Sequence, residues 1–153
     1  MASHFPVNHP LRPTYRALGG LAGLYLIVFG ILGLIETSGD ELFAQNDAEA
    51  LWQGTNLGHS VISIAVGLII LIGVAVGRNL DVAIHKAAGY GLAAVSLASL
   101  ALLRTDANYL NFTMPTVIVT MVLALALLLA GMYGKLGTEE QARVSREARL
   151  FLE

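Results

Sequence analysis

Two histidines, His59 and His85, are the side chains of this sequence best suited to bind a haem or a metal ion. Each stands near the start of a long apolar segment, and only the short turn at residues 78–81 separates the two segments. Such a turn makes consecutive helices antiparallel, which would hold the two imidazoles ~25–30 Å apart across a bilayer. One metal centre cannot use both, and the chain has no cysteine. We therefore expect no metal or other cofactor.

A second group of polar residues stands at those ends of the apolar segments, and in those loops, that we expect on the extracytoplasmic side, called the outer face below. The candidate binding residues of this outer face are Glu36, His59, Arg104, Asp106, Asn108 and Asn111. They could bind an extracytoplasmic ligand, or His59 could pair with a carboxylate such as Glu36 or Asp106 and respond to pH. The alternative is that these groups only cap helices and close turns, which is common for Asn and Asp.

Signatures of catalysis and of nucleic-acid binding are missing from the sequence. It has no Gly-rich phosphate loop, no HExxH motif and no Ser-His-Asp set with credible spacing. It also has no basic cluster interleaved with aromatic residues. The long apolar segments carry no ionisable residue near their middle, which a proton- or ion-coupled transporter generally needs. We therefore expect neither an enzyme nor a nucleic-acid-binding protein.

The apolar content of the chain predicts its fold class. Hydrophobic residues make up 56% and charged residues 13% of the 153 residues, whereas a soluble domain has about 25% charged residues. A chain this short cannot bury so many apolar side chains in one core, so the excess must face lipid. A membrane-spanning helix needs ~20 apolar residues, and four segments qualify: 17–35, 57–77, 82–103 and 116–134. The sequence predicts an all-α fold with a four-transmembrane-helix bundle over residues 17–137.

The basic residues predict how this bundle is oriented. One side of a four-span arrangement holds eight of the nine: Arg12, Arg16, Arg78, Lys86, Lys135, Arg143, Arg146 and Arg149. The other side holds only Arg104. Because Lys and Arg are enriched in cytoplasmic loops, we expect both the N- and the C-terminus in the cytoplasm. The bias toward Ala, Gly, Leu and Arg suits a bacterial plasma membrane protein.

Three segments are expected to lie outside the lipid. The prolines of residues 1–16 predict an extended cytoplasmic arm. In the first outer loop, Ser38 and Glu41 fit a capping box, which favours a short outer interfacial helix; a solvated acidic loop is an equal alternative. In residues 138–153, Thr138 and Gln141 form a second capping box that predicts a cytoplasmic amphipathic helix.

In the predicted tail helix, apolar residues recur at helical spacing, and basic residues stand between them in the sequence. The apolar positions are Val144, Ala148 and Phe151. Such a helix could lie on anionic lipid headgroups or dock on a partner, and a frayed polar tail is the alternative.

Small residues recur at intervals of four along the predicted spans. The candidate packing positions are Gly19, Gly23, Gly73, Gly77, Ala87, Gly91, Ala130 and Gly134. Small residues let helix backbones approach closely, either inside one bundle or between chains. The pattern therefore allows a homo-oligomer or a place in a larger membrane complex, in addition to contact with the lipid bilayer. In an oligomeric transporter, the hydroxyl groups lining the path would be those of Ser63, Ser96, Ser99 and Thr120.

Three motifs resemble those of a known family. They are HFPVNHPLRP at residues 4–13, GRNLD at residues 77–81 and TDANYLNF at residues 105–112. They resemble a bacterial, chiefly actinobacterial, family of four-span membrane proteins classed as a domain of unknown function. The resemblance covers residues 4–137 and implies a four-helix bundle in the plasma membrane, with no catalytic residues to carry over.

These observations favour one function and leave two alternatives. We expect a non-enzymatic accessory or structural subunit that acts through helix association. The alternatives are a small oligomeric transporter or channel, and a pH or ligand sensor that uses the outer polar face.

Overall fold

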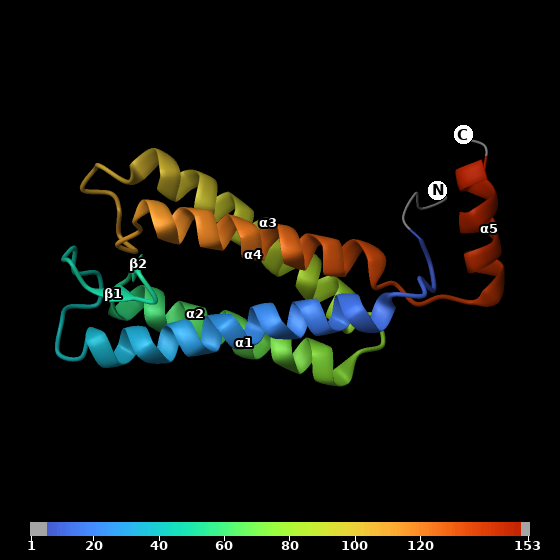
Figure 1. Ribbon diagram of the computed structural model, residues 1–153, viewed down its shortest axis with the longest axis horizontal. Helices are drawn as coiled ribbons and strands as arrows, with labels where there is room; N and C mark the ends of the chain where they lie inside the picture. Colours follow the sequence, from blue (N-terminus) through green and yellow to red (C-terminus); the bar gives the residue numbers. More distant parts are fainter. Residues whose placement is uncertain (1–5, 151–153) are drawn as a thin grey trace.

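The structure, a computed structural model, describes residues 6–150 and is almost entirely helical (Figure 1). The helices are α1 (Arg12–Glu36), α2 (Leu57–Val76), α3 (Leu80–Leu102), α4 (Met114–Tyr133) and α5 (Glu139–Leu150). Strands β1 (Glu49–Ala50) and β2 (Gln53–Gly54) form a small antiparallel hairpin. The predicted all-α class is confirmed, with this hairpin as an addition.

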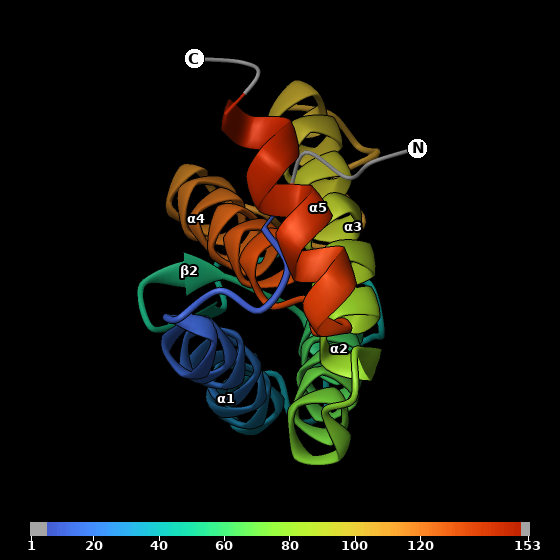
Figure 2. The same cartoon turned by 90° about the vertical axis from the view of Figure 1, so that its right-hand side faces the viewer.

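The four long helices lie side by side and form the helical body, α1–α4 (Figure 1). The most extensive contacts are within two antiparallel pairs, α1 with α2 and α3 with α4. One end of the body, the hairpin end, carries β1, β2 and the α3–α4 loop. At the other end, the turn end, α1 begins, residues 77–79 join α2 to α3, and α4 stops. Helix α5 crosses beyond the turn end (Figure 2).

Three helices of the body, α1, α2 and α4, are long and apolar enough to cross a membrane. The first two turns of α3 carry Asp81, His85 and Lys86, and this helix is not in that set. All four predicted segments are nevertheless helical, and the bounds of the last three differ from the predicted ones by at most two residues.

The start of α1 corrects the prediction that residues 1–16 form an extended arm. The helix begins at Arg12, with Pro13 in its first turn. A proline is tolerated there because the first N–H groups of a helix have no partner within the helix. Pro6 and Pro10 do precede the helix, and residues 1–5 lie outside the described part of the chain.

The first outer loop corrects a second prediction, because no interfacial helix forms between α1 and α2. Gly39 has a φ of 97°, a left-handed conformation that a helix cannot continue. The loop instead makes turns and the β1–β2 hairpin, whose tip residues Leu51 and Trp52 also have positive φ. Trp52 is 83% exposed at that tip.

The helix predicted in the tail is confirmed over Glu139–Leu150, including its cap. The backbone N–H of Thr138 donates to Gln141 Oε1 at 3.1 Å, and the N–H of Gln141 donates to Thr138 Oγ1 at 3.3 Å. Val144, one of the predicted apolar positions, is exposed, and Phe151 lies outside the described residues.

Candidate functional site

A cavity of about 300 Å³ lies among the four long helices, between their middle and the hairpin end. Its wall is mostly apolar, with residues such as Leu26 of α1 and Leu92 of α3. Its polar groups are His59 and Ser63 of α2 and Thr120 of α4. A small, mostly apolar space with a few polar groups is the usual form of a ligand site.

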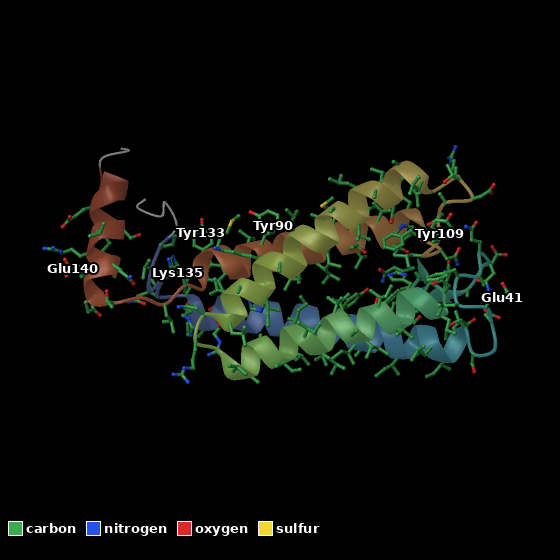
Figure 3. All side chains as sticks on the ribbon, turned by 180° about the vertical axis from the view of Figure 1, so that it is seen from behind. Glu41, Tyr90, Tyr109, Tyr133, Lys135 and Glu140 are labelled. Carbon is green, nitrogen blue, oxygen red and sulfur yellow. The ribbon has the colours of Figure 1, made fainter. Side chains whose placement is uncertain are left out.

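The cavity arises because the two helix pairs separate toward the hairpin end (Figure 1). Figure 3 shows the same arrangement from behind, with Tyr90 on α3 and Tyr109 in the loop at the hairpin end. The packing glycine Gly91 has no atom within 4 Å of the place where a Cβ would stand, and it lines the cavity. The face of α3 that carries Gly91 is therefore not pressed against a neighbouring helix.

His59 is held tightly in the cavity wall. Its ring packs against Phe29 of α1 and Phe112 of the α3–α4 loop, with ring centroids 5.0 and 4.7 Å apart. The residue is 7% exposed. The ring hydrogen-bonds to the backbone of Gly54, while its Nδ1 atom is buried and has no partner in residues 6–150. A backbone carbonyl accepts, so Nε2 carries the proton and Nδ1 is left as an acceptor.

The structure does not gather the predicted outer-face residues around His59. Glu36, Arg104 and Asp106 are exposed, and within residues 6–150 none of them forms an ion pair with His59 or with another of the three. Glu36 is the last residue of α1 and faces solvent, whereas His59 lies beneath the loops. The suggested pairing of His59 with a carboxylate such as Glu36 or Asp106 is therefore wrong.

Asn108 closes its own loop, and Asn111 joins that loop to the segment between α1 and α2. Asn108 Oδ1 accepts from the backbone N–H of Phe112 at 2.9 Å, and its Nδ2 donates to the Phe112 carbonyl at 2.9 Å. Asn111 Nδ2 donates to the carbonyls of Asn46 and Thr55, both at 2.8 Å. These amides satisfy buried backbone groups, which is what turn and cap residues do.

Asn56 connects the α1–α2 and α3–α4 loops, and it was not among the residues predicted from the sequence. Its Oδ1 caps α2 by accepting from the N–H of His59 at 2.9 Å. Its Nδ2 donates to Ala44 at 3.2 Å and to Tyr109 at 2.8 Å, one carbonyl in each loop. An Asn directly before an apolar segment is a typical N-cap, so the sequence did contain this signal. The loops form a hydrogen-bonded roof over the hairpin end of the cavity.

A buried ionic cluster at the turn end was also missed. Asp81 of α3 is 1% exposed, and its Oδ2 lies 3.1 Å from Arg12 Nη2 and 3.1 Å from Arg16 Nε. Arg12 Nε also donates to the Gly134 carbonyl at 2.9 Å. The cluster therefore ties α1 to α3 and to the end of α4. A lone carboxylate among the basic residues of that end was the available signal.

The two histidines lie at opposite ends of the helical body, as the sequence predicted. His59 begins α2 near the hairpin, and His85 lies one turn after Asp81. His85 is 1% exposed, and its ring abuts Gly19 of α1.

Most of the predicted packing positions are used inside the chain. A Cβ would meet a neighbouring helix within 3 Å at Gly19, Gly23 and Gly73. Gly77 ends α2 with a φ of 65°, and Gly134 follows α4 and lies near Val82. Ala130 is buried, whereas Ala87 and Gly91 on α3 are exposed. Among the predicted packing positions, only Ala87 and Gly91 on α3 are therefore free to contact another chain.

The four hydroxyl residues do not line one path. Ser63 and Thr120 face the cavity. Ser96 is buried and donates to the Val117 carbonyl at 2.9 Å. Ser99 belongs to a second cavity of about 210 Å³ near the α3–α4 loop.

Comparison with known proteins gives a family and no closer relative. No curated protein and no solved structure matches the chain. The family model described as "Domain of unknown function (DUF4383)" matches residues 16–133. This range contains the cavity, the roof and Asp81, and it leaves out the N-terminal arm and α5. Because the match covers most of the chain, the protein belongs to the DUF4383 family, whose function is unknown.

Proposed function

We propose that this protein is a four-span protein of the bacterial plasma membrane, with both termini in the cytoplasm, and that it binds a lipophilic small molecule without catalysing a reaction. The cavity of about 300 Å³, with its apolar wall and three polar side chains, is the observation that carries this proposal. Ligand sites in proteins usually have this form.

The environment of α3 supports a fourth span. Of the three polar residues in its first two turns, Asp81, His85 and Lys86, the first two are turned inward and 1% exposed, and Asp81 is paired with two arginines. Its outward face is apolar, with Leu97 59% and Leu100 46% exposed. The helix has 23 residues, which gives ~34 Å at ~1.5 Å per residue and is enough for the hydrocarbon layer. Because α3 packs along α4, a membrane crossed by α4 would enclose α3 at the same depth.

The charge distribution supports cytoplasmic termini. Arg12, Arg16, Arg78 and Lys135 all lie at the turn end, and α5 with its own arginines lies beyond it (Figure 1). Arg104 is the basic residue of the hairpin end among those described. The excess of basic residues at the turn end favours the cytoplasm for that end.

Cysteine labelling tests the four spans and their direction. The chain has no cysteine, so Ser38→Cys, Thr105→Cys and Thr138→Cys each add one unique thiol at an exposed position. We expect a membrane-impermeant maleimide to label residues 38 and 105 in intact cells, and residue 138 only after permeabilisation. Labelling of residues 38 and 138 together with protection of residue 105 would contradict the fourth span, and labelling of residue 138 alone would contradict the direction.

The rim of the cavity indicates where a ligand enters. Ile62 of α2 is 47% exposed and Val95 of α3 is 38% exposed, although both line the cavity. The opening therefore lies on the lateral surface of the helical body, between α2 and α3, and this surface faces lipid in a four-span arrangement. The roof covers the hairpin end, so the bilayer is the phase from which a molecule would enter.

Blocking the cavity tests the binding function. In Gly91→Leu the new side chain grows into open space, and we expect at least ~10-fold weaker binding of a fluorescent long-chain alcohol. Ala101→Leu adds similar bulk at an exposed position of α3 and should bind like the wild type. Binding is measured by saturable energy transfer from Trp52, the only tryptophan. Equal affinity of both variants would contradict the proposal.

Association through α3 is a second candidate function. Ala87 and Gly91 of its small-residue stripe are exposed, and such stripes let a second helix approach closely. The partner would be a second copy or another subunit of a membrane complex. The native mass of the particle in mild detergent tests this, since a mass of one chain with no other protein would contradict it.

A further inference from the structure

We infer that the cavity selects an uncharged lipophile that ends in a hydroxyl group, and that this hydroxyl binds at the polar patch formed by His59, Ser63 and Thr120. The inference rests on the proposed binding function and adds the chemical class of the ligand. It follows from the hydrogen-bonding state of these three side chains and from the distribution of charge around them.

His59 supplies an acceptor that the protein leaves unused. Because its ring hydrogen-bonds to the backbone of Gly54, the other nitrogen, Nδ1, carries a lone pair and no proton. Nδ1 is buried without a partner in the described part of the chain, and the ring is held between Phe29 and Phe112. A buried polar atom without a hydrogen bond is costly, so a ligand that donates to Nδ1 gains more than one that only fills space.

Ser63 and Thr120 supply the complementary groups. Ser63 follows His59 by four residues and therefore lies on the same face of α2, while Thr120 projects from α4. They are 4% and 7% exposed, and neither hydroxyl bonds to another group within the described residues. This is unusual for Ser and Thr inside a helix, which commonly bond back to their own backbone. Each can donate to the oxygen of a ligand hydroxyl.

The surroundings exclude a charged head group. Among the described residues no charged side chain lines the cavity, and the paired charges of Asp81, Arg12 and Arg16 lie at the turn end. A carboxylate or an ammonium group would be buried here without a counter-ion, which is strongly unfavourable. An alcohol both donates and accepts and carries no charge, so it matches the patch.

Displacement by three matched compounds tests the inference on the full-length protein. Dodecan-1-ol, its methyl ether and dodecanoate share one chain and differ in the head group. We expect the alcohol to displace the fluorescent alcohol at least ~10-fold more effectively than either of the others, because only it can donate to Nδ1 without a charge. Equal displacement by alcohol and ether would overturn the inference and leave the proposed function standing.

Two variants place the effect at the patch. His59→Phe keeps an aromatic ring between Phe29 and Phe112 but removes the acceptor, so the preference for alcohol over ether should disappear. Thr120→Val keeps the shape and should weaken the alcohol by ~5- to 10-fold, which tests the patch even if the His59 variant does not fold. An unchanged preference in both variants would overturn the inference. If none of the three compounds displaces the probe, and Gly91→Leu binds it like the wild type, the proposed function itself fails.

Discussion

Asp81→Asn is expected to lower the free energy of unfolding by about 3 kcal/mol, because it leaves Arg12 and Arg16 without their counter-charge. Removing one partner of a buried ion pair usually costs ~3–5 kcal/mol. The lower end applies here since the Arg16 side chain is 32% exposed and partly hydrated. The contact joins residues 69 positions apart, so its loss also loosens α1 from α3.

The measurement is thermal unfolding in mild detergent, where 3 kcal/mol corresponds to a melting temperature lower by about 10 °C for a chain of this size. Asp106→Asn is the matched control, because it removes an exposed carboxylate at the other end of the helical body. A change of less than ~0.5 kcal/mol is expected for it. If the two variants melted at the same temperature, the ionic cluster would not hold the turn end together.

Gly67→Ala is expected to destabilise the protein although alanine favours helices. A Cβ at this position would stand 2.6 Å from the carbonyl oxygen of Gly23 and 2.7 Å from Ile27 Cγ1. The obstacle is the backbone of α1, which cannot move without separating the two helices. Overpacking of this kind costs ~1–3 kcal/mol, and at a site limited by backbone the upper half of that range exceeds the ~1 kcal/mol gained in helix propensity.

Gly91→Ala is the control for this prediction because it makes the same change in an open place. No atom lies within 4 Å of its Cβ position, so only the gain in helix propensity of up to ~1 kcal/mol remains. The melting temperature should therefore fall for Gly67→Ala and rise for Gly91→Ala. A rise for both variants would show that α1 and α2 are not in close contact at Gly23 and Gly67.

The elements predicted well are those that depend on local patterns. Apolar runs gave the four long helices, and the pairing of Thr138 with Gln141 gave the start of α5. The two errors come from competition that a local pattern does not show. Pro13 suited the first turn of a helix as well as an extended arm. The pair Ser38 and Glu41 fitted the start of a helix, but the segment forms turns and a hairpin that residues of another loop hold in place.

The cavity and the ionic cluster depend on contacts between residues far apart in the chain. His59 stood out in the sequence, where a carboxylate was one possible partner for it. The actual neighbours are Phe29 and Phe112, which precede and follow it by 30 and more residues. Asp81 was seen only as part of a turn, because nothing local to it indicated Arg12 and Arg16 as partners. The separation of the helix pairs that opens the cavity is a property of packing and leaves no mark on hydropathy.

The long separation between Asp81 and its arginines has a consequence for biogenesis. During synthesis Arg12 and Arg16 emerge well before Asp81, since the pair with Arg12 spans 69 positions. In the proposed four-span arrangement, the two guanidinium groups lack their carboxylate partner until Asp81 has been made, and their charge favours the cytoplasmic side for the start of α1. When the third helix arrives, the carboxylate pairs with both guanidinium groups and joins the early helix to the late one. One acidic residue thereby makes the order of translation part of how the membrane protein assembles.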